Sequence, residues 1–368
     1  MGNKRHIAFV SLLVAMLFGF AWVVLLQSRS EPVYEGKPLS DWLESIKKND
    51  GFDPDAESAV RAIGTNALPA LLNMVRVGNS AIRQGLTELS LNQKWIPIST
   101  RSQWQFQEAA EIGFGLLGSS AKAAVPALVD CLQEDDSRIR ACAAYCLGKI
   151  GPASHSAVPV LVKSLGSALG RKGREQDAVE MFCEATALGE IGPAARAAIL
   201  QLNLFSTLTN HSFYPWVRAQ AALIKIRGDS LLPLSEALKD TSNQTNWLQS
   251  ASVVSYLGSY VEPTIPSLLA ALRRTNADNQ KFVIRLLGQI HSRPEVCIPA
   301  IIPFLQSTDY GTCTDSIEAI RAFGGTPNQL GLDEITRLLS NSIPTVREEA
   351  AKALRKMTPE VAAKAMAK

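Results

Sequence analysis

One phrase recurs along most of the chain: an apolar segment that ends in Leu-Gly, a short polar link, and an apolar residue followed by proline that opens another apolar segment. The Leu-Gly pairs and their variants are Ile63-Gly64, Leu117-Gly118, Leu147-Gly148, Leu188-Gly189, Leu257-Gly258, Leu287-Gly288 and Phe323-Gly324. A fixed period is typical of folds in which one copy cannot bury its apolar face alone and stacks on its neighbours. The repeat therefore predicts a stack of similar units.

The apolar residues of each copy have helical spacing. In the copy at 138–165 the first stripe is Ile139, Ala143, Cys146, Leu147 and Ile150, and the second is Val158, Leu161, Val162 and Leu165. Steps of three and four residues are those of a helix with one apolar face. The glycine near the end of the first helix either takes a left-handed capping conformation or lets two helices cross closely, and both interpretations stay open.

Proline marks the start of the second helix, where the first turn has no internal partner for its N–H groups. The residues are Pro69, Pro126, Pro159, Pro233, Pro266 and Pro299, with Ile199 in the equivalent place of the fourth copy. From Pro126 the steps are 33, 40, 34, 33 and 33 residues. Two helices per step predict an all-α fold, an α-solenoid of about eight helical hairpins between Ala56 and Leu339, closed by a polar terminal helix at 346–357.

The first thirty residues predict a membrane anchor. Ile7 to Leu26 is a run of twenty residues without a charge, which as a helix spans the roughly 30 Å apolar core of a bilayer. We expect residues 1–30 to be a cytoplasmic tail and a transmembrane signal anchor through residues 7–26. The repeat domain would then lie outside the cytoplasm on the cytoplasmic membrane, in the periplasm of a Gram-negative cell. A cleaved and exported form is the alternative, although 28–30 is a poor cleavage site.

A lead-in at 31–55 separates the anchor from the repeat domain at 56–368. Ser40 is the predicted cap of a helix whose Trp42, Leu43 and Ile46 would cover the open apolar end of the first repeat.

Two insertions interrupt the period, near 78–108 and near 166–177. The first contains Trp95, Arg101 and Trp104, and the second contains Arg171, Lys172 and Arg174. Tryptophan and arginine are favoured at the centres of protein interfaces, and loops added to a scaffold often carry its function. These six residues are the candidate contacts with a protein partner. The alternatives are that the tryptophans pack the insertion onto the scaffold and that the charges are only solvated.

Charge and chemistry exclude several other functions. From Glu31 onward the chain carries 34 basic and 34 acidic residues, whereas a nucleic-acid binder normally has a basic excess, so no nucleic-acid partner is expected. The cysteines form no Cys-x-x-Cys, and Cys142 and Cys146 fall on an apolar face where packing is the expected role. No catalytic motif is present. We therefore predict no catalytic residue, no metal and no cofactor.

The phrase Ile139-Arg140-Ala141-Cys142-Ala143-Ala144, with copies at 217–222 and 346–351, resembles the first helix of HEAT repeats, especially the short HEAT-like repeats of phycobilin lyases. The lead-in at 34–43 is similar to the one before HEAT arrays in anchored or exported bacterial proteins. The resemblance implies a partner-binding scaffold, often one whose concave surface of second helices holds a protein segment, but carries over no particular residues. A di-iron hydroxylase of this family uses repeated His-Glu pairs, and this sequence has none.

These observations favour a membrane-tethered, non-enzymatic scaffold that binds a protein of unknown identity. The alternatives are a lyase-like or cofactor-handling repeat protein and a structural spacer in an envelope complex.

Overall fold

The computed structural model describes residues 31–48, 53–77, 102–170, 175–208, 213–240, 242–273, 276–290, 292–323 and 329–357. The predicted membrane anchor at 7–26 and most of the first insertion lie outside the described residues. The chain divides into two compact units, Met1–Ala197 and Ala198–Lys368, hereafter the N-terminal and C-terminal units.

The N-terminal unit begins with a small antiparallel hairpin in which Val33 pairs with Pro38. Its elements are β1 (Val33–Tyr34), β2 (Lys37–Pro38), α2 (Leu39–Lys48), α3 (Pro54–Ile63), η1 (Gly64–Ala67), α4 (Leu68–Val75), α6 (Gln103–Leu117), η2 (Gly118–Ala124), α7 (Val125–Cys131), α8 (Ser137–Ile150), η3 (Gly151–Ala157), α9 (Val158–Gly170) and α10 (Glu175–Ile191), followed by η4 (Gly192–Ala198).

All the secondary-structure elements in the described residues of the C-terminal unit are helices. Its elements are α11 (Ile199–Leu208), α12 (Phe213–Arg227), α13 (Leu232–Lys239), α14 (Gln244–Ser255), η5 (Gly258–Thr264), α15 (Ile265–Leu272), α16 (Ala277–Ile290), α17 (Pro294–Ile301), η6 (Ile302–Gln306), α18 (Tyr310–Ala322), α19 (Gln329–Arg337), η7 (Leu338–Ser340) and α20 (Pro344–Met357).

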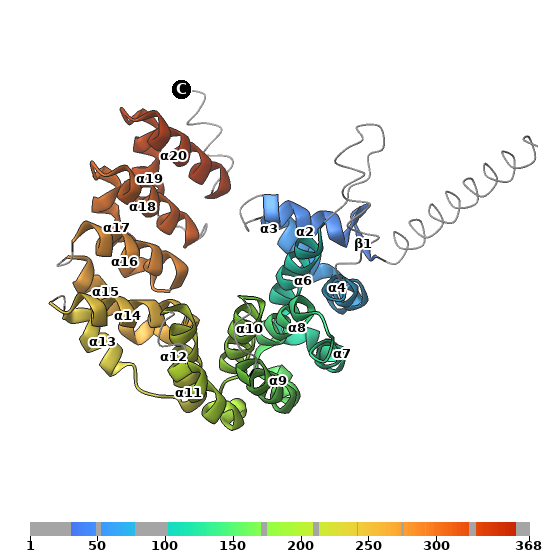
Figure 1. Cartoon of the computed structure of the whole chain (residues 1–368). Helices are drawn as coiled ribbons and strands as arrows, with labels where there is room; N and C mark the ends of the chain where they lie inside the picture. The colour runs from blue at the N-terminus through green and yellow to red at the C-terminus, as the bar shows by residue number, and fades with distance from the viewer. Residues whose placement is uncertain are drawn as a thin grey trace, which may run out of the picture. The chain divides into compact units, whose positions relative to one another are not determined.

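First and second helices alternate in sequence order, from α3 and α4 to α18 and α19, and α20 follows the last pair. In the N-terminal unit, α6, α8 and α10 pack side by side as one layer, and α4, α7 and α9 form the other (Figure 1). The C-terminal unit has one continuous core, which runs from Val217 to Leu354 through every helical pair between them. The prediction of an all-α repeat fold is confirmed.

The glycines of the Leu-Gly pairs have two different functions. Gly64 and Gly118 end α3 and α6 with φ of +59° and +50°, a conformation that glycine adopts without strain. Gly148 instead lies inside α8, where an added Cβ would stand 3.0 Å from the Cα of Ala187 on α10. Gly288 likewise lies inside α16, with Ala319 of α18 close to it. Capping and close helix crossing therefore both occur, in different copies.

Most of the predicted prolines are the second residue of a second helix, as in α7 and α15. Pro299 is a wrong prediction, because it lies inside α17. Arg293 takes φ of +54° there, and Pro294 opens the helix five residues earlier. Ile199 is the first residue of α11, so Leu200, not Ile199, occupies the proline position, and its side chain is exposed like those prolines.

Helix α2 buries Trp42, Leu43 and Ile46, and it packs against α3 and α6. The prediction that Ser40 caps this helix is wrong. Ser40 lies inside α2, which begins at the fully buried Leu39, and its backbone N–H donates to Oε2 of Glu31 at 3.1 Å. With Ser40 as the cap the helix would begin at Asp41, so burial of Leu39 accompanies a helix start two residues earlier than the polar sequence pattern indicates.

The arginine of the recurring Val-Arg or Ile-Arg phrase ties its helix to the preceding loop. Nη1 of Arg140 donates to the carbonyl oxygens of Glu134 at 2.7 Å and Asp135 at 2.8 Å. Nη1 of Arg347 donates to those of Asn341 at 2.7 Å and Ser342 at 3.1 Å. The acceptors are six and five residues upstream in both of these copies, so in each of them the arginine fixes the loop before its own helix.

Among the described residues, Gln103–Cys131 is long and apolar enough to cross a membrane by length and composition. This stretch consists of α6, η2 and α7, which all pack against α8 inside the N-terminal unit. It is accordingly a part of the repeat stack.

Candidate functional site

Helix α6 presents one stripe of residues outward. The helix starts at a capping box, in which the backbone N–H of Ser102 donates to Oε1 of Gln105 at 2.8 Å. Its apolar side buries Ala110, Phe114 and Leu117. The opposite side carries the outward stripe, in helical steps: Trp104, Glu108, Glu111, Ile112 and Gly115. Trp104, one of the predicted contact residues, is 56% exposed.

A pocket of about 360 Å³ crosses this stripe near the end of α6. We call it the α6 pocket, and its lining residues come from α2, α3, α6 and α8: Ile46, Glu57, Glu108, Glu111, Ile112, Gly115, Leu116, Tyr145 and Lys149. It lies on the layer of first helices. The resemblance to HEAT repeats had instead directed attention to the second helices.

The pocket exists because α6 and α8 leave open space between them at Gly115. Gly115 and Gly148 are equivalent, since each stands three residues before a capping glycine, Gly118 or Gly151. A Cβ on Gly148 would press on the backbone of the next first helix, but a Cβ on Gly115 would meet only the side-chain Cδ of Lys149, at 3.7 Å. The absent side chain at position 115 therefore leaves open space.

Lys47 contacts both Trp104 and Glu108 at the edge of the pocket. Nζ of Lys47 lies 4.1 Å from the centroid of the Trp104 ring, and the same ammonium forms an ion pair with Glu108. A cation over an aromatic face is attracted by its electrons. Lys47 thus holds the tryptophan ring and Glu108 in place on the outward stripe.

Glu111 differs from the other acids of the pocket in its polar contacts. Its carboxyl forms no hydrogen bond or ion pair with any of the described residues. Burial raises the pKa of Glu111 to about 7, the positive charge of Lys149 opposes this rise, and the negative charge of Glu108 adds to it. Near neutral pH the pocket therefore contains a carboxyl group that is balanced between its two charge states.

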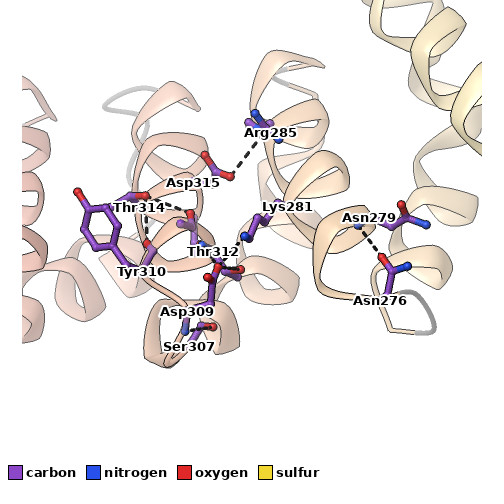
Figure 2. A network of polar contacts seen from close by, with 12 residues as sticks. Asn276, Asn279, Lys281, Arg285, Ser307, Asp309, Tyr310, Thr312, Thr314 and Asp315 are labelled. Carbon is purple, nitrogen blue, oxygen red and sulfur yellow. Dashed lines mark hydrogen bonds and ion pairs between the residues drawn. The ribbon is translucent and has the colours of Figure 1, made fainter.

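Two acids between other neighbouring first helices, Glu180 and Asp309, are paired. Arg140 of α8 forms two bonds of 2.7 Å with the buried carboxylate of Glu180 on α10. Between α16 and α18, Nζ of Lys281 lies 3.0 Å from Oδ2 of Asp309 (Figure 2). The hydroxyl of Thr312, followed by Lys281, lowers the pKa of Asp309 to about 2. Glu111 departs from this pattern.

Of the predicted contact residues, the structure places Trp104 alone. Trp95, Arg101, Arg171, Lys172 and Arg174 lie outside the described residues. The sequence interpretation missed Glu111, Tyr145 and Lys149, because Glu111 belongs to a different repeat from the other two and no motif joins them.

The cysteines take the expected places on the core faces. Cys131, Cys142, Cys146, Cys297 and Cys313 are buried. A hydrogen bond with Cys146, followed by burial, raises the pKa of the Cys142 thiol, and burial raises the pKa values of the other four. A raised pKa keeps a thiol protonated and unreactive. Among the described residues, no three His, Cys, Asp or Glu side chains gather as metal ligands.

Comparison with known proteins agrees with this architecture. Residues 93–181 match the family described as HEAT repeats. No curated protein matches the chain. The phycobilin-lyase type and the anchored bacterial type stay predictions.

Solved structures with similarity include human deoxyhypusine hydroxylase in complex with glycerol, at 19% identity over 75% of this chain and 96% of that chain, with a TM-score of 0.31. Two engineered proteins match at 20% and 18% identity over 64% of this chain and 96% and 98% of theirs, both with TM-scores of 0.22. At these values the likeness says nothing about what this chain binds or catalyses. The stacked helical pairs make this chain an all-α helical repeat protein, and its residues 93–181 are similar to HEAT repeats.

Proposed function

We propose that this protein is a membrane-tethered, non-enzymatic scaffold that binds a protein partner through the outward face of α6. The repeat fold supports this proposal because stacked repeats offer extended surfaces that suit protein partners. The charge-free run at 7–26 supports the tether, with the repeat domain outside the cytoplasm.

The observation that carries the proposal is the exposed Trp104 beside the α6 pocket. A tryptophan with 56% of its surface in water, held in position by Lys47, presents apolar area at little entropic cost. Tryptophan is enriched among the residues that dominate binding energy. The neighbouring pocket gives a partner side chain a place to enter. Trp95, Arg101 and the basic residues 171, 172 and 174 are further proposed contacts.

The test is affinity purification of the full-length protein, tagged at its C-terminus, from detergent-solubilised membranes, followed by mass spectrometry. We expect a stoichiometric companion protein, and an intact mass that includes residues 1–30. Trp104→Ala should reduce recovery of the companion at least about tenfold, as expected for a central interface residue.

Tyr310→Ala is the matched control. Tyr310 is also an exposed aromatic residue in the first turn of a first helix, α18, and it does not line the α6 pocket. Its replacement should leave the companion bound. Recovery of the protein alone from every preparation, or equal loss in the two variants, would contradict the proposal.

A further inference from the structure

We propose that the α6 pocket receives one arginine or lysine side chain from a basic segment of the partner. This inference rests on the proposed function and specifies the chemistry of the partner. The pocket has the shape, the lining and the charge that a long cationic side chain requires, and each is argued separately below.

The lining matches the two parts of such a side chain. Ile46, Ile112 and Leu116 offer aliphatic surface for the methylene stem, and Gly115 leaves the space that the stem would fill. Lysine and arginine commonly lay their stems along apolar surface while the charged end contacts polar groups. The volume of about 360 Å³ exceeds that of one side chain, so water molecules can enter with it.

The charges favour a cation over an anion. Three carboxyl groups, Glu57, Glu108 and Glu111, line the pocket with one cation, Lys149. Arg61 lies 3.9 Å from Glu57, and Lys47 pairs with Glu108. This leaves the carboxyl of Glu111 as an acceptor that a guanidinium or ammonium could bind directly. A charge-assisted hydrogen bond inside a partly buried site is among the stronger polar contacts.

The surroundings favour a side chain on a protein over a free amine. Trp104 and Glu111 are seven residues apart on α6, two helical turns, so both lie on the outward stripe. A segment whose basic residue enters the pocket would extend along this stripe and cover the exposed tryptophan ring. A free amine would leave that ring in water.

The probe for the test is fluorescein-labelled nona-arginine, with nona-citrulline as its uncharged analogue. Binding to the full-length protein in detergent is measured by fluorescence polarisation. We expect nona-arginine to bind and nona-citrulline not to bind. Two variants act on the pocket in different ways: Glu111→Gln removes the charge at constant shape, and Gly115→Leu fills the space from a helical, exposed position.

Each pocket variant should weaken nona-arginine binding by at least about tenfold, the change expected from one charge-assisted contact. Glu348→Gln on α20 is the control, because Glu348 is an exposed helical acid far along the sequence from the pocket. Thermal melting checks that all variants fold. Equal binding by wild type, Glu111→Gln and Gly115→Leu would overturn the inference.

A pH series separates Glu111 from the overall charge of the protein. Wild-type binding should strengthen from pH 6 to pH 8 as the carboxyl of Glu111 loses its proton, and Glu111→Gln should not show this change. The other charged groups that line the pocket, Glu57, Glu108 and Lys149, are the same in both proteins. An identical pH profile in wild type and Glu111→Gln would also overturn the inference.

Purification of the companion protein distinguishes the two proposals. If Trp104→Ala releases the companion while Glu111→Gln and Gly115→Leu retain it, the pocket inference is wrong and the scaffold proposal stands. If no companion is ever recovered, the scaffold proposal fails. Loss of the companion in all three variants supports both.

Discussion

At the scale of single residues, Glu111 has a carboxyl group whose ionisation opposes folding. Its pKa is about 7 in the folded chain and 4.5 without the surrounding structure. Between these two values the folded chain binds more protons than the unfolded chain, so this group's contribution to stability falls as the pH rises from about 4.5 to about 7 and stays low above that. The carboxylate of Glu111 lowers the stability of the fold at neutral pH, and a role in binding would explain its presence.

We therefore predict that Glu111→Gln makes the protein more stable at pH 8 and nearly unchanged at pH 5. One pKa unit corresponds to about 1.4 kcal/mol, and partial access to water reduces the full shift, so the expected gain in the free energy of unfolding is about 1–2 kcal/mol. Urea unfolding at the two pH values measures it. Glu348→Gln should show no such gain, and a variant less stable than wild type at pH 8 would show that the carboxylate is stabilised in the fold.

At the scale of helices, spacing between neighbours depends on which residues meet where they cross. Gly148 and Gly288 admit the backbone of the next first helix, whereas Gly115 does not meet a backbone at all. The same residue type at the same place in the repeat thus produces a tight crossing in two copies and a pocket in another.

Alanine substitutions should distinguish the two kinds of crossing. Gly115→Ala should raise the melting temperature, because alanine favours a helix over glycine by about 1 kcal/mol and the added methyl group has room. Gly148→Ala and Gly288→Ala should lower it, since overpacking costs about 1–3 kcal/mol. Gly288→Ala should be the more severe, because its Cβ would lie 2.7 Å from the Cα of Ala319. The same direction of change in all three variants would contradict this account.

Local rules predicted the helices well. The buried stripe of α8, which includes Ile139, Cys146 and Ile150, depends only on spacing along the sequence. The exceptions, Ser40 and Pro299, arise where burial of Leu39 or an earlier proline outweighs the local preference. The pocket could not be predicted in this way, because Glu57, Glu111 and Lys149 lie on three repeats, and the distance between helices decides whether they share a space.

At the scale of the whole molecule, stability is distributed among neighbouring repeats. Trp247 is fully buried in the continuous core of the C-terminal unit, where its ring meets Phe282 edge-on at 6.1 Å. Its Nε1–H donates to the carbonyl oxygen of Leu238 at 3.2 Å. One side chain therefore joins α13, α14 and α16, which belong to three successive helical pairs.

Trp247→Ala should destabilise the C-terminal unit by about 3–5 kcal/mol, through a cavity and an unpaired carbonyl. Because a repeat contacts mainly its neighbours, the loss of hydrogen-exchange protection should be greatest in α13 to α16 and smaller in α20. Hydrogen exchange with mass spectrometry measures the gradient. A uniform loss across the unit would indicate that its repeats unfold as one cooperative block.

The arginine that ties α8 and α20 to their preceding loops has an evolutionary consequence. Arg140 and Arg347 donate hydrogen bonds to carbonyl groups five and six residues upstream. Each of these copies therefore contains the residues that position the start of its own helix. A duplicated segment of one period would therefore form the same pair of helices at its new place in the stack. Its first helix would lie close to the next first helix, or leave a space, according to the residue opposite its glycine. An ancestral gene could thus have gained length by whole repeats and acquired a pocket at one crossing by a single small change.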